Sequence, residues 1–113
     1  MHWRSIQNRE ELTRALEKSL SAPVLLFKHS TRCAISSMAF DRLDRYWDEE
    51  EMQQTEGYLI DVIRNRDLSN YIQEHFSIRH ESPQILLIRD GKVIFHDSHM
   101  GIAYDSLRSA LPG

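Results

Sequence analysis

The stretch VLLFKHSTRCAISSMAF, residues 24–40, decides the fold because it joins three different patterns. Residues 24–28 form a nearly continuous apolar run, which is typical of a strand buried within a parallel sheet. The polar segment HSTR, residues 29–32, follows as a loop, and a helix is predicted to begin near Cys33. Functional residues of such sheets gather where strands lead into helices. Cys33 lies at a point of this kind.

The rest of the chain continues the alternation of strands and helices. Two β-rich runs flank Asp90-Gly91, a dipeptide that favours a tight hairpin because it tolerates positive φ. The predicted strands are 2–6, 24–28, 58–63 and the two arms of a hairpin over 84–97. The predicted helices are 8–20, 33–47, 66–76 and 104–113, with a loop over 77–83 and a linker over 98–103.

These elements predict a single domain that spans residues 1–113, a length that suits one domain. Helices between apolar strands imply parallel pairing with crossovers, and the hairpin adds an antiparallel edge. We therefore expect an α/β fold with a mixed central sheet flanked by helices on both faces.

The composition restricts the function. The formal net charge is −3 with both signs interspersed, which argues against nucleic-acid and anionic-membrane partners because phosphate binding needs clustered cations. No apolar run approaches the roughly 20 residues of a membrane span. The chain has one cysteine, and its six histidines lack a metal-site spacing, so we expect no metal site. A monomeric protein of the cytoplasm, where thiols stay reduced, is the expectation.

Cys33 is predicted to be reactive, rather than the small buried hydrophobe that a lone cysteine often is. Only a thiolate attacks, and the first turn of a helix favours an anion through its unpaired N–H groups and its dipole. Ser36 would add a hydroxyl donor and Arg32 a positive charge. Because Ser36 stands three residues on, where a dithiol enzyme carries its second cysteine, Cys33 cannot release a mixed disulfide internally. A monothiol exchange with an external thiol follows.

Other candidates have competing interpretations. His29 could deprotonate Cys33, but a structural or exposed role is favoured because its side-chain direction is unknown. Lys28 and Arg32 either attract the carboxylates of a small thiol or are solvated surface charges. Asp61 is either a buried proton relay or a strand-end residue that faces solvent, the latter being favoured.

Several apolar positions are assigned to packing. Trp3 is expected to pack against other residues, and the helix over 33–47 is expected to bury Met38, Leu43, Tyr46 and Trp47.

The segments KHSTRCAISSMAF, residues 28–40, and ESPQILLIRDGKV, residues 81–93, carry a resemblance. The strand–loop–helix with Cys33, the later Ser82-Pro83 and the closing hairpin resemble the thioredoxin superfamily from Trp3 to Leu111. More narrowly, the two segments are similar to the monothiol bacilliredoxin family, thioredoxin-like proteins that act with the small thiol bacillithiol. The resemblance implies an enzyme, a thiol-disulfide oxidoreductase, with no tightly bound cofactor.

The resemblance also implies roles for individual residues. Cys33 would take bacillithiol from S-bacillithiolated proteins, with bacillithiol itself as co-substrate. Pro83 would be a cis proline that faces Cys33, and the Ser82 backbone would pair with the bound thiol or peptide. Gly101 would give clearance beside the sulfur. Ala34 departs from the proline of the family pattern, which leaves one more N–H donor and a looser first turn.

Two alternatives remain open at this point. A monothiol glutaredoxin-like carrier would hold an iron–sulfur cluster between two subunits, although the Gly-Phe that usually follows its cysteine is replaced by Ala34-Ile35. A thioredoxin-like interaction or stress module would carry Cys33 as an incidental thiol.

Overall fold

The computed structural model describes residues 3–112. Along this part of the chain, strands and helices alternate as the sequence predicts. The elements are β1 (Trp3–Ser5), α1 (Arg9–Lys18), β2 (Val24–His29), α2 (Ala34–Tyr46), β3 (Glu56–Asp61), α3 (Arg66–Phe76), β4 (Gln84–Arg89), β5 (Lys92–Ser98), the 3-10 helix η1 (His99–Gly101) and α4 (Tyr104–Ala110). None of these helices is long and apolar enough to cross a membrane.

The sheet has the order β1-β3-β2-β4-β5. The first three strands in this order pair in parallel, and β4 and β5 add the antiparallel edge that the hairpin predicts. The register places His29 beside Asp61 and Lys28 beside Gln84, so the ends of β2 and β3 meet the start of β4. The predicted mixed sheet is confirmed.

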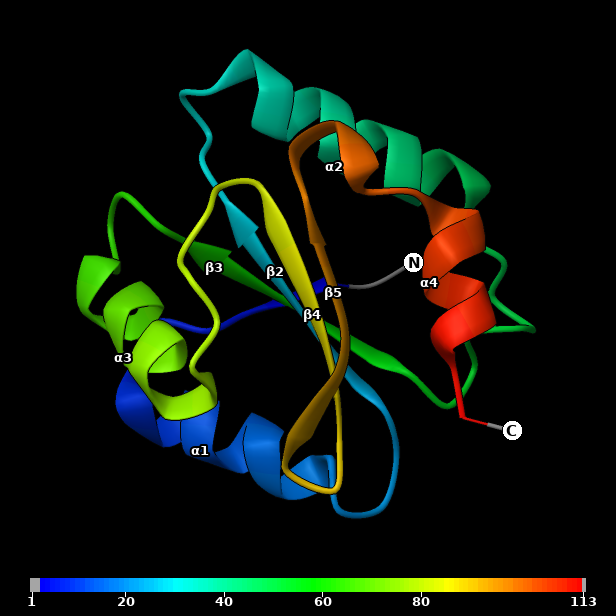
Figure 1. Ribbon diagram of the computed structural model, residues 1–113, viewed down its shortest axis with the longest axis horizontal. Helices are drawn as coiled ribbons and strands as arrows, with labels where there is room; N and C mark the ends of the chain where they lie inside the picture. The colour runs from blue at the N-terminus through cyan, green and yellow to red at the C-terminus, as the bar shows by residue number, and fades with distance from the viewer. Residues whose placement is uncertain (1–2, 113) are drawn as a thin grey trace.

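Helices cover both faces of the sheet (Figure 1). One apolar layer lies beneath α1 and α3, where Leu12, Leu26, Leu68 and Leu86 are buried together. The other lies beneath α2 and α4, where Phe27, Leu43, Ile85 and Leu107 are buried. Because successive strand residues point to opposite faces, the run VLLF serves both layers, and this explains why it reads as continuously apolar.

The hairpin turn is built as predicted and is fastened to the end of α1. Asp90 and Gly91 have φ values of 56° and 73°, the positive values that the Asp-Gly dipeptide tolerates. The Asp90 N–H donates to the Ser19 carbonyl at 2.7 Å, and the Gly91 N–H donates to the Ser19 hydroxyl oxygen at 3.0 Å. Ser19 is fully buried by these contacts.

Two predictions of buried helix positions were wrong. In α2 the buried face consists of Ser36, Ala39 and Leu43, which are three and four residues apart. Met38 lies off this stripe and is 57% exposed, and Tyr46, three residues after Leu43 at the last position of the helix, is 61% exposed. Leu43 is confirmed as buried, and Trp47 is half-buried against the same layer.

Two element boundaries also differ from the prediction. Helix α1 ends at Lys18, and Leu20 beyond it is exposed. Strand β3 spans Glu56–Asp61 rather than 58–63. It ends there because one Asp61 carboxylate oxygen accepts the N–H groups of Ile63 and Arg64, at 3.0 and 3.1 Å, and so turns the chain.

The packing role predicted for Trp3 is confirmed. Its ring lies 5.9 Å from the ring of Phe27, 5.6 Å from that of Phe40 and 5.5 Å from that of Trp47. This aromatic cluster joins the edge strand β1 to α2.

Candidate active site around Cys33

Cys33 occupies the N-cap of α2, directly after the loop that leaves β2. Its backbone N–H donates to the Ser30 carbonyl at 3.2 Å, and its carbonyl accepts the Ser37 N–H at 3.1 Å. These bonds fix the backbone on both sides of the thiol. The side chain is half-buried and caps no helix N–H, so the thiol is partly accessible, and its reactivity stays a prediction.

Ser36 faces the interior instead of the solvent. It is fully buried, and its hydroxyl oxygen lies 2.7 Å from Nδ1 of His29 and accepts the Ser30 N–H at 3.0 Å. A serine hydroxyl carries one hydrogen. When Nδ1 of His29 is unprotonated, that hydrogen is given to the ring. It becomes available to another acceptor only when Nδ1 is protonated, so any donation from Ser36 to the sulfur depends on His29.

His29 is a site residue that the sequence interpretation set aside. It is the last residue of β2, and its half-buried ring lies 5.7 Å from the ring of Phe27 and 5.6 Å from that of Phe40. Burial lowers the pKa of His29, and the carboxylates of Asp61 and Asp41 oppose this effect. The neutral ring is therefore favoured. The bond to Ser36 could not be foreseen because the direction of a strand-end side chain is not set by sequence pattern.

Lys28 is not a solvated surface charge, and that interpretation was wrong. Its burial gives no support to the other interpretation, in which Lys28 attracts the carboxylates of a small thiol. Lys28 is fully buried, with its ammonium 3.4 Å from the Ser69 carbonyl and 3.2 Å from Nδ1 of His80. No carboxylate forms an ion pair with it among residues 3–112. Desolvation lowers the pKa of Lys28 from 10.5 to about 8.

The peptide bond between Ser82 and Pro83 is cis, as the resemblance implied. Pro83 is buried, and its carbonyl accepts the His99 N–H at 3.0 Å. The loop that carries both residues lies at the same end of the sheet as the start of α2 (Figure 1). Within the described chain, the Ser82 N–H and carbonyl form no hydrogen bond. They are therefore available to a bound chain or thiol, although that role stays a prediction.

Side-chain hydrogen bonds fix the loop over residues 77–83, which precedes β4. Gln84 is buried opposite Lys28 and donates its amide to the Arg79 carbonyl at 3.0 Å, and Gln73 accepts the His80 N–H. The buried amide of Gln84 therefore holds the loop through the Arg79 carbonyl.

The remaining predicted residues flank this arrangement. Arg32 and Ala34 are exposed on either side of Cys33, so both are accessible to a ligand of the thiol. Gly101 ends η1, and a side chain there would run into the carboxylate of Asp97. A larger residue at Gly101 would therefore have to displace the Asp97 side chain, while the predicted clearance beside the sulfur stays a prediction.

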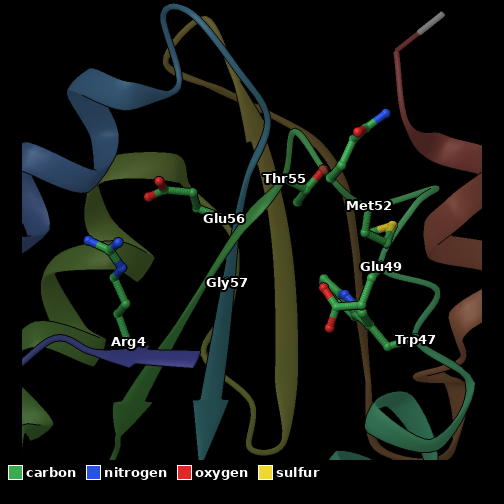
Figure 2. A pocket seen from close by; sticks show the side chains of 8 residues that line it. Arg4, Trp47, Glu49, Met52, Thr55, Glu56 and Gly57 are labelled. Carbon is green, nitrogen blue, oxygen red and sulfur yellow. The ribbon is translucent and has the colours of Figure 1, made fainter. Parts of the chain in front are cut away.

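Figure 2 shows a different hollow, lined by Arg4, Trp47, Met52 and Glu56 among others. It lies where β3 begins. Because β2 and β3 are parallel and Cys33 follows the end of β2, this hollow lies at the opposite end of the sheet. It is not part of the Cys33 site.

Residues 4–107 match the family model described as monothiol bacilliredoxin BrxC. The chain belongs to the monothiol bacilliredoxin family. The match confirms the family that the segments around Cys33 and Pro83 resemble. It covers most of the chain, from β1 to α4.

Solved structures confirm the thioredoxin-like fold. A structure described as a candidate oxidoreductase with a thioredoxin fold is 29% identical, with a TM-score of 0.82, over 95% of this chain and 91% of that one. Thioredoxin O1 from Arabidopsis thaliana is 14% identical, with a TM-score of 0.75, over 98% of both chains. Fasciola hepatica thioredoxin is 16% identical, with a TM-score of 0.72, over 94% of this chain and 93% of that one. Family and fold together are those of thiol-disulfide oxidoreductases.

Proposed function

We propose that this protein removes bacillithiol from S-bacillithiolated proteins through Cys33, in a monothiol exchange. The observation that carries the proposal is the position of the single cysteine. Cys33 is half-exposed at the start of α2 in a chain of the monothiol bacilliredoxin family, and a buried serine stands three residues on. The site thus has one sulfur for attack and none for release.

The reaction has two steps. In the first, the Cys33 thiolate attacks the bacillithiol sulfur of the mixed disulfide, and the protein thiolate leaves and takes up a proton. Cys33 then carries bacillithiol in a new disulfide. In the second, a free bacillithiol thiolate attacks that adduct, forms bacillithiol disulfide and releases the Cys33 thiolate. Over both steps, the client cysteine returns to its thiol form, one free bacillithiol is consumed, and both bacillithiols end in one disulfide, while the protein is unchanged.

Other residues support this exchange in assigned roles. Ser36 stands in place of a resolving cysteine and holds His29 and the Ser30 N–H at the base of the Cys33 loop. The unpaired Ser82 backbone beside the cis Pro83 would bind the backbone of the client or the adduct. Arg32 and Ala34 border the sulfur, and Gly101 keeps the turn after β5 narrow. The proposed location is the cytoplasm, where thiols are kept reduced.

Intact-protein mass spectrometry after incubation with a bacillithiolated model protein tests the first step. The wild type is expected to gain one bacillithiol and to release the model protein in its thiol form, whereas Cys33→Ser gains nothing. A Cys33→Ser/Ser37→Cys double variant is the matched control, because it moves the one thiol one turn along α2. Equal transfer to the wild type and to this control would contradict the proposal, since any thiol on the surface would then suffice.

A further inference from the structure

A second hollow lies at the end of the sheet that carries Cys33. It opens where the parallel strands β1, β3 and β2 end, and it offers a volume of about 170 Å³. The side chains that matter for its chemistry are Gln7, His29, Thr31, Asp61, Arg64 and Asn65. In sheets with parallel strands, ligands bind outside the carboxyl ends of those strands.

The hollow is adjacent to the loop that holds the thiol. Thr31 lines it and lies two residues before Cys33, so their Cα atoms are at most about 7 Å apart. His29 lines it as well and bonds to Ser36 in the first turn of α2. The loop that leads to Cys33 thus borders the hollow, although Cys33 itself does not line it.

The polar groups in the hollow have spare binding capacity. Asn65 is only 9% exposed, and although it occupies the N-cap of α3, its side chain caps nothing and has no hydrogen-bond partner within residues 3–112. Its amide atoms are not enclosed in the protein, so they are open to the hollow and can donate to or accept from a ligand there.

Two charges at the hollow are also open to a ligand. Arg64 is exposed, and its guanidinium forms no ion pair in the described part of the chain. Asp61 uses one carboxylate oxygen for the N–H groups of Ile63 and Arg64, which leaves its second oxygen unpaired. The hollow thus offers a ligand three groups, which are the guanidinium of Arg64, the amide of Asn65 and one carboxylate oxygen of Asp61.

We propose that this hollow binds the non-thiol part of the small thiol that exchanges with Cys33. This inference rests on the proposed function and names the subsite for its co-substrate. The ligand is a thiol that carries carboxylates, hydroxyls and an ammonium group, as bacillithiol does in its malyl, sugar and cysteinyl parts. Arg64 binds a carboxylate, Asn65 a hydroxyl or amide, and Asp61 the ammonium group or a hydroxyl.

The test compares two leaving adducts on the same model protein, bacillithiol and 2-mercaptoethanol, which lacks all of these groups. Loss of a hydrogen bond to a charged group costs about 1.5–3 kcal/mol, so Arg64→Ala should lower kcat/KM for the bacillithiol adduct about tenfold or more. The rate with the 2-mercaptoethanol adduct should not change. Arg66→Ala, which removes another exposed charge two residues away and outside the hollow, should change neither rate.

The outcomes separate this inference from the proposed function. If the wild type accepts bacillithiol and Arg64→Ala performs equally well, the subsite is wrong while the exchange reaction stands. If Arg64→Ala slows both adducts equally, Arg64 acts on Cys33 or on the fold, and the subsite is again wrong. If the wild type accepts neither adduct, the proposed function fails and the subsite with it. Arg64→Gln, which keeps a polar side chain and removes only the charge and the guanidinium fork, repeats the test with less disturbance.

Discussion

Lys28 and His29 are consecutive residues at the end of β2, yet they support opposite halves of the site. Strand residues alternate between faces, so Lys28 points into the layer of α1 and α3, and His29 into the layer of α2. Lys28 reaches Ser69 and His80, which are 41 and 52 residues away, and so supports the loop before Pro83. His29 reaches Ser36, seven residues away, and so supports the loop before Cys33.

The two supports differ in their energetic character. Lys28 is a buried charge without an acidic partner, and such a charge destabilises the native state. His29 is half-buried and neutral by preference, so its bond to Ser36 imposes no comparable penalty. The two loops therefore differ in what supports them. The loop before Pro83 contacts a buried ammonium that lowers the stability of the native state, whereas the loop before Cys33 is held by backbone hydrogen bonds and a neutral histidine.

The largest expected effect comes from Lys28→Met. A pKa of about 8 in place of 10.5 corresponds to about 3 kcal/mol of destabilisation at pH 7, against which the variant loses hydrogen bonds of about 1 kcal/mol each. We expect the free energy of unfolding to rise by about 1–3 kcal/mol at pH 7. The advantage should shrink as pH rises from 8 to 10.5, because the native wild type then loses its buried proton before the unfolded chain does.

Urea unfolding at pH 7 and pH 10 measures this effect, with Lys92→Met as the control at an exposed position. A loss of stability at pH 7 in Lys28→Met would show that the ammonium stabilises the fold. The comparison between the two faces would then be reversed.

A smaller effect is expected from Ser36→Ala on the other face. The substitution removes the partner of the Ser30 N–H and of Nδ1 in His29. Both residues are half-buried, so we expect a loss of about 1 kcal/mol, the low end of the cost of an unsatisfied buried group. Ser37→Ala, one residue along and half-buried, should stay within about 0.5 kcal/mol. Urea unfolding of both variants checks this, and equal stabilities would mean that the His29 contact carries no weight.

The smallest expected effect concerns the titration of His29. The Asp61 carboxylate raises the pKa of His29 more than the Asp41 carboxylate does, against the dominant effect of burial. Asp61→Asn should therefore lower the pKa of His29 further than Asp41→Asn does, as followed by NMR. A histidine whose pKa is lowered in the folded state makes its full contribution to stability above pH 6.5, and this contribution is lost as pH falls from 6.5 through the lowered pKa. An unchanged or higher pKa in Asp61→Asn would remove Asp61 from the surroundings of His29.

The fold could be predicted from sequence because its signals are local. The apolar run over 24–27 and the Asp90-Gly91 turn each report their own structure, and the order of the elements then leaves few topologies. Met38 and Tyr46 were misplaced because α2 has more apolar residues than its buried stripe can hold. The buried stripe begins at Ser36. A prediction that buries only apolar residues therefore misses the first position of the stripe.

The position of Cys33 at the start of a helix could be predicted from the sequence, but the contacts of Lys28 and His29 around it could not. Cys33 follows from its place between a strand and a helix. Lys28 ends an apolar run, where a lysine ordinarily reaches solvent, and the partners that hold it inside come from α3 and the loop beyond it. No sequence pattern points to Arg64 and Asn65 either. They are brought together with the other lining residues only by folding, where the ends of three strands meet.

The edges of the sheet bear on how this protein meets others. An open strand edge is a template on which a second chain can pair and aggregate. Here β1 is only three residues long, and β5 alternates between exposed and half-buried residues, with Lys92 and His96 among the exposed ones and a register shift at Leu87 and Ile88 of its partner strand. Short, charged and irregular edges discourage such pairing. If the protein exchanges thiols with other chains, as proposed above, these edges protect it from pairing with them through its own backbone.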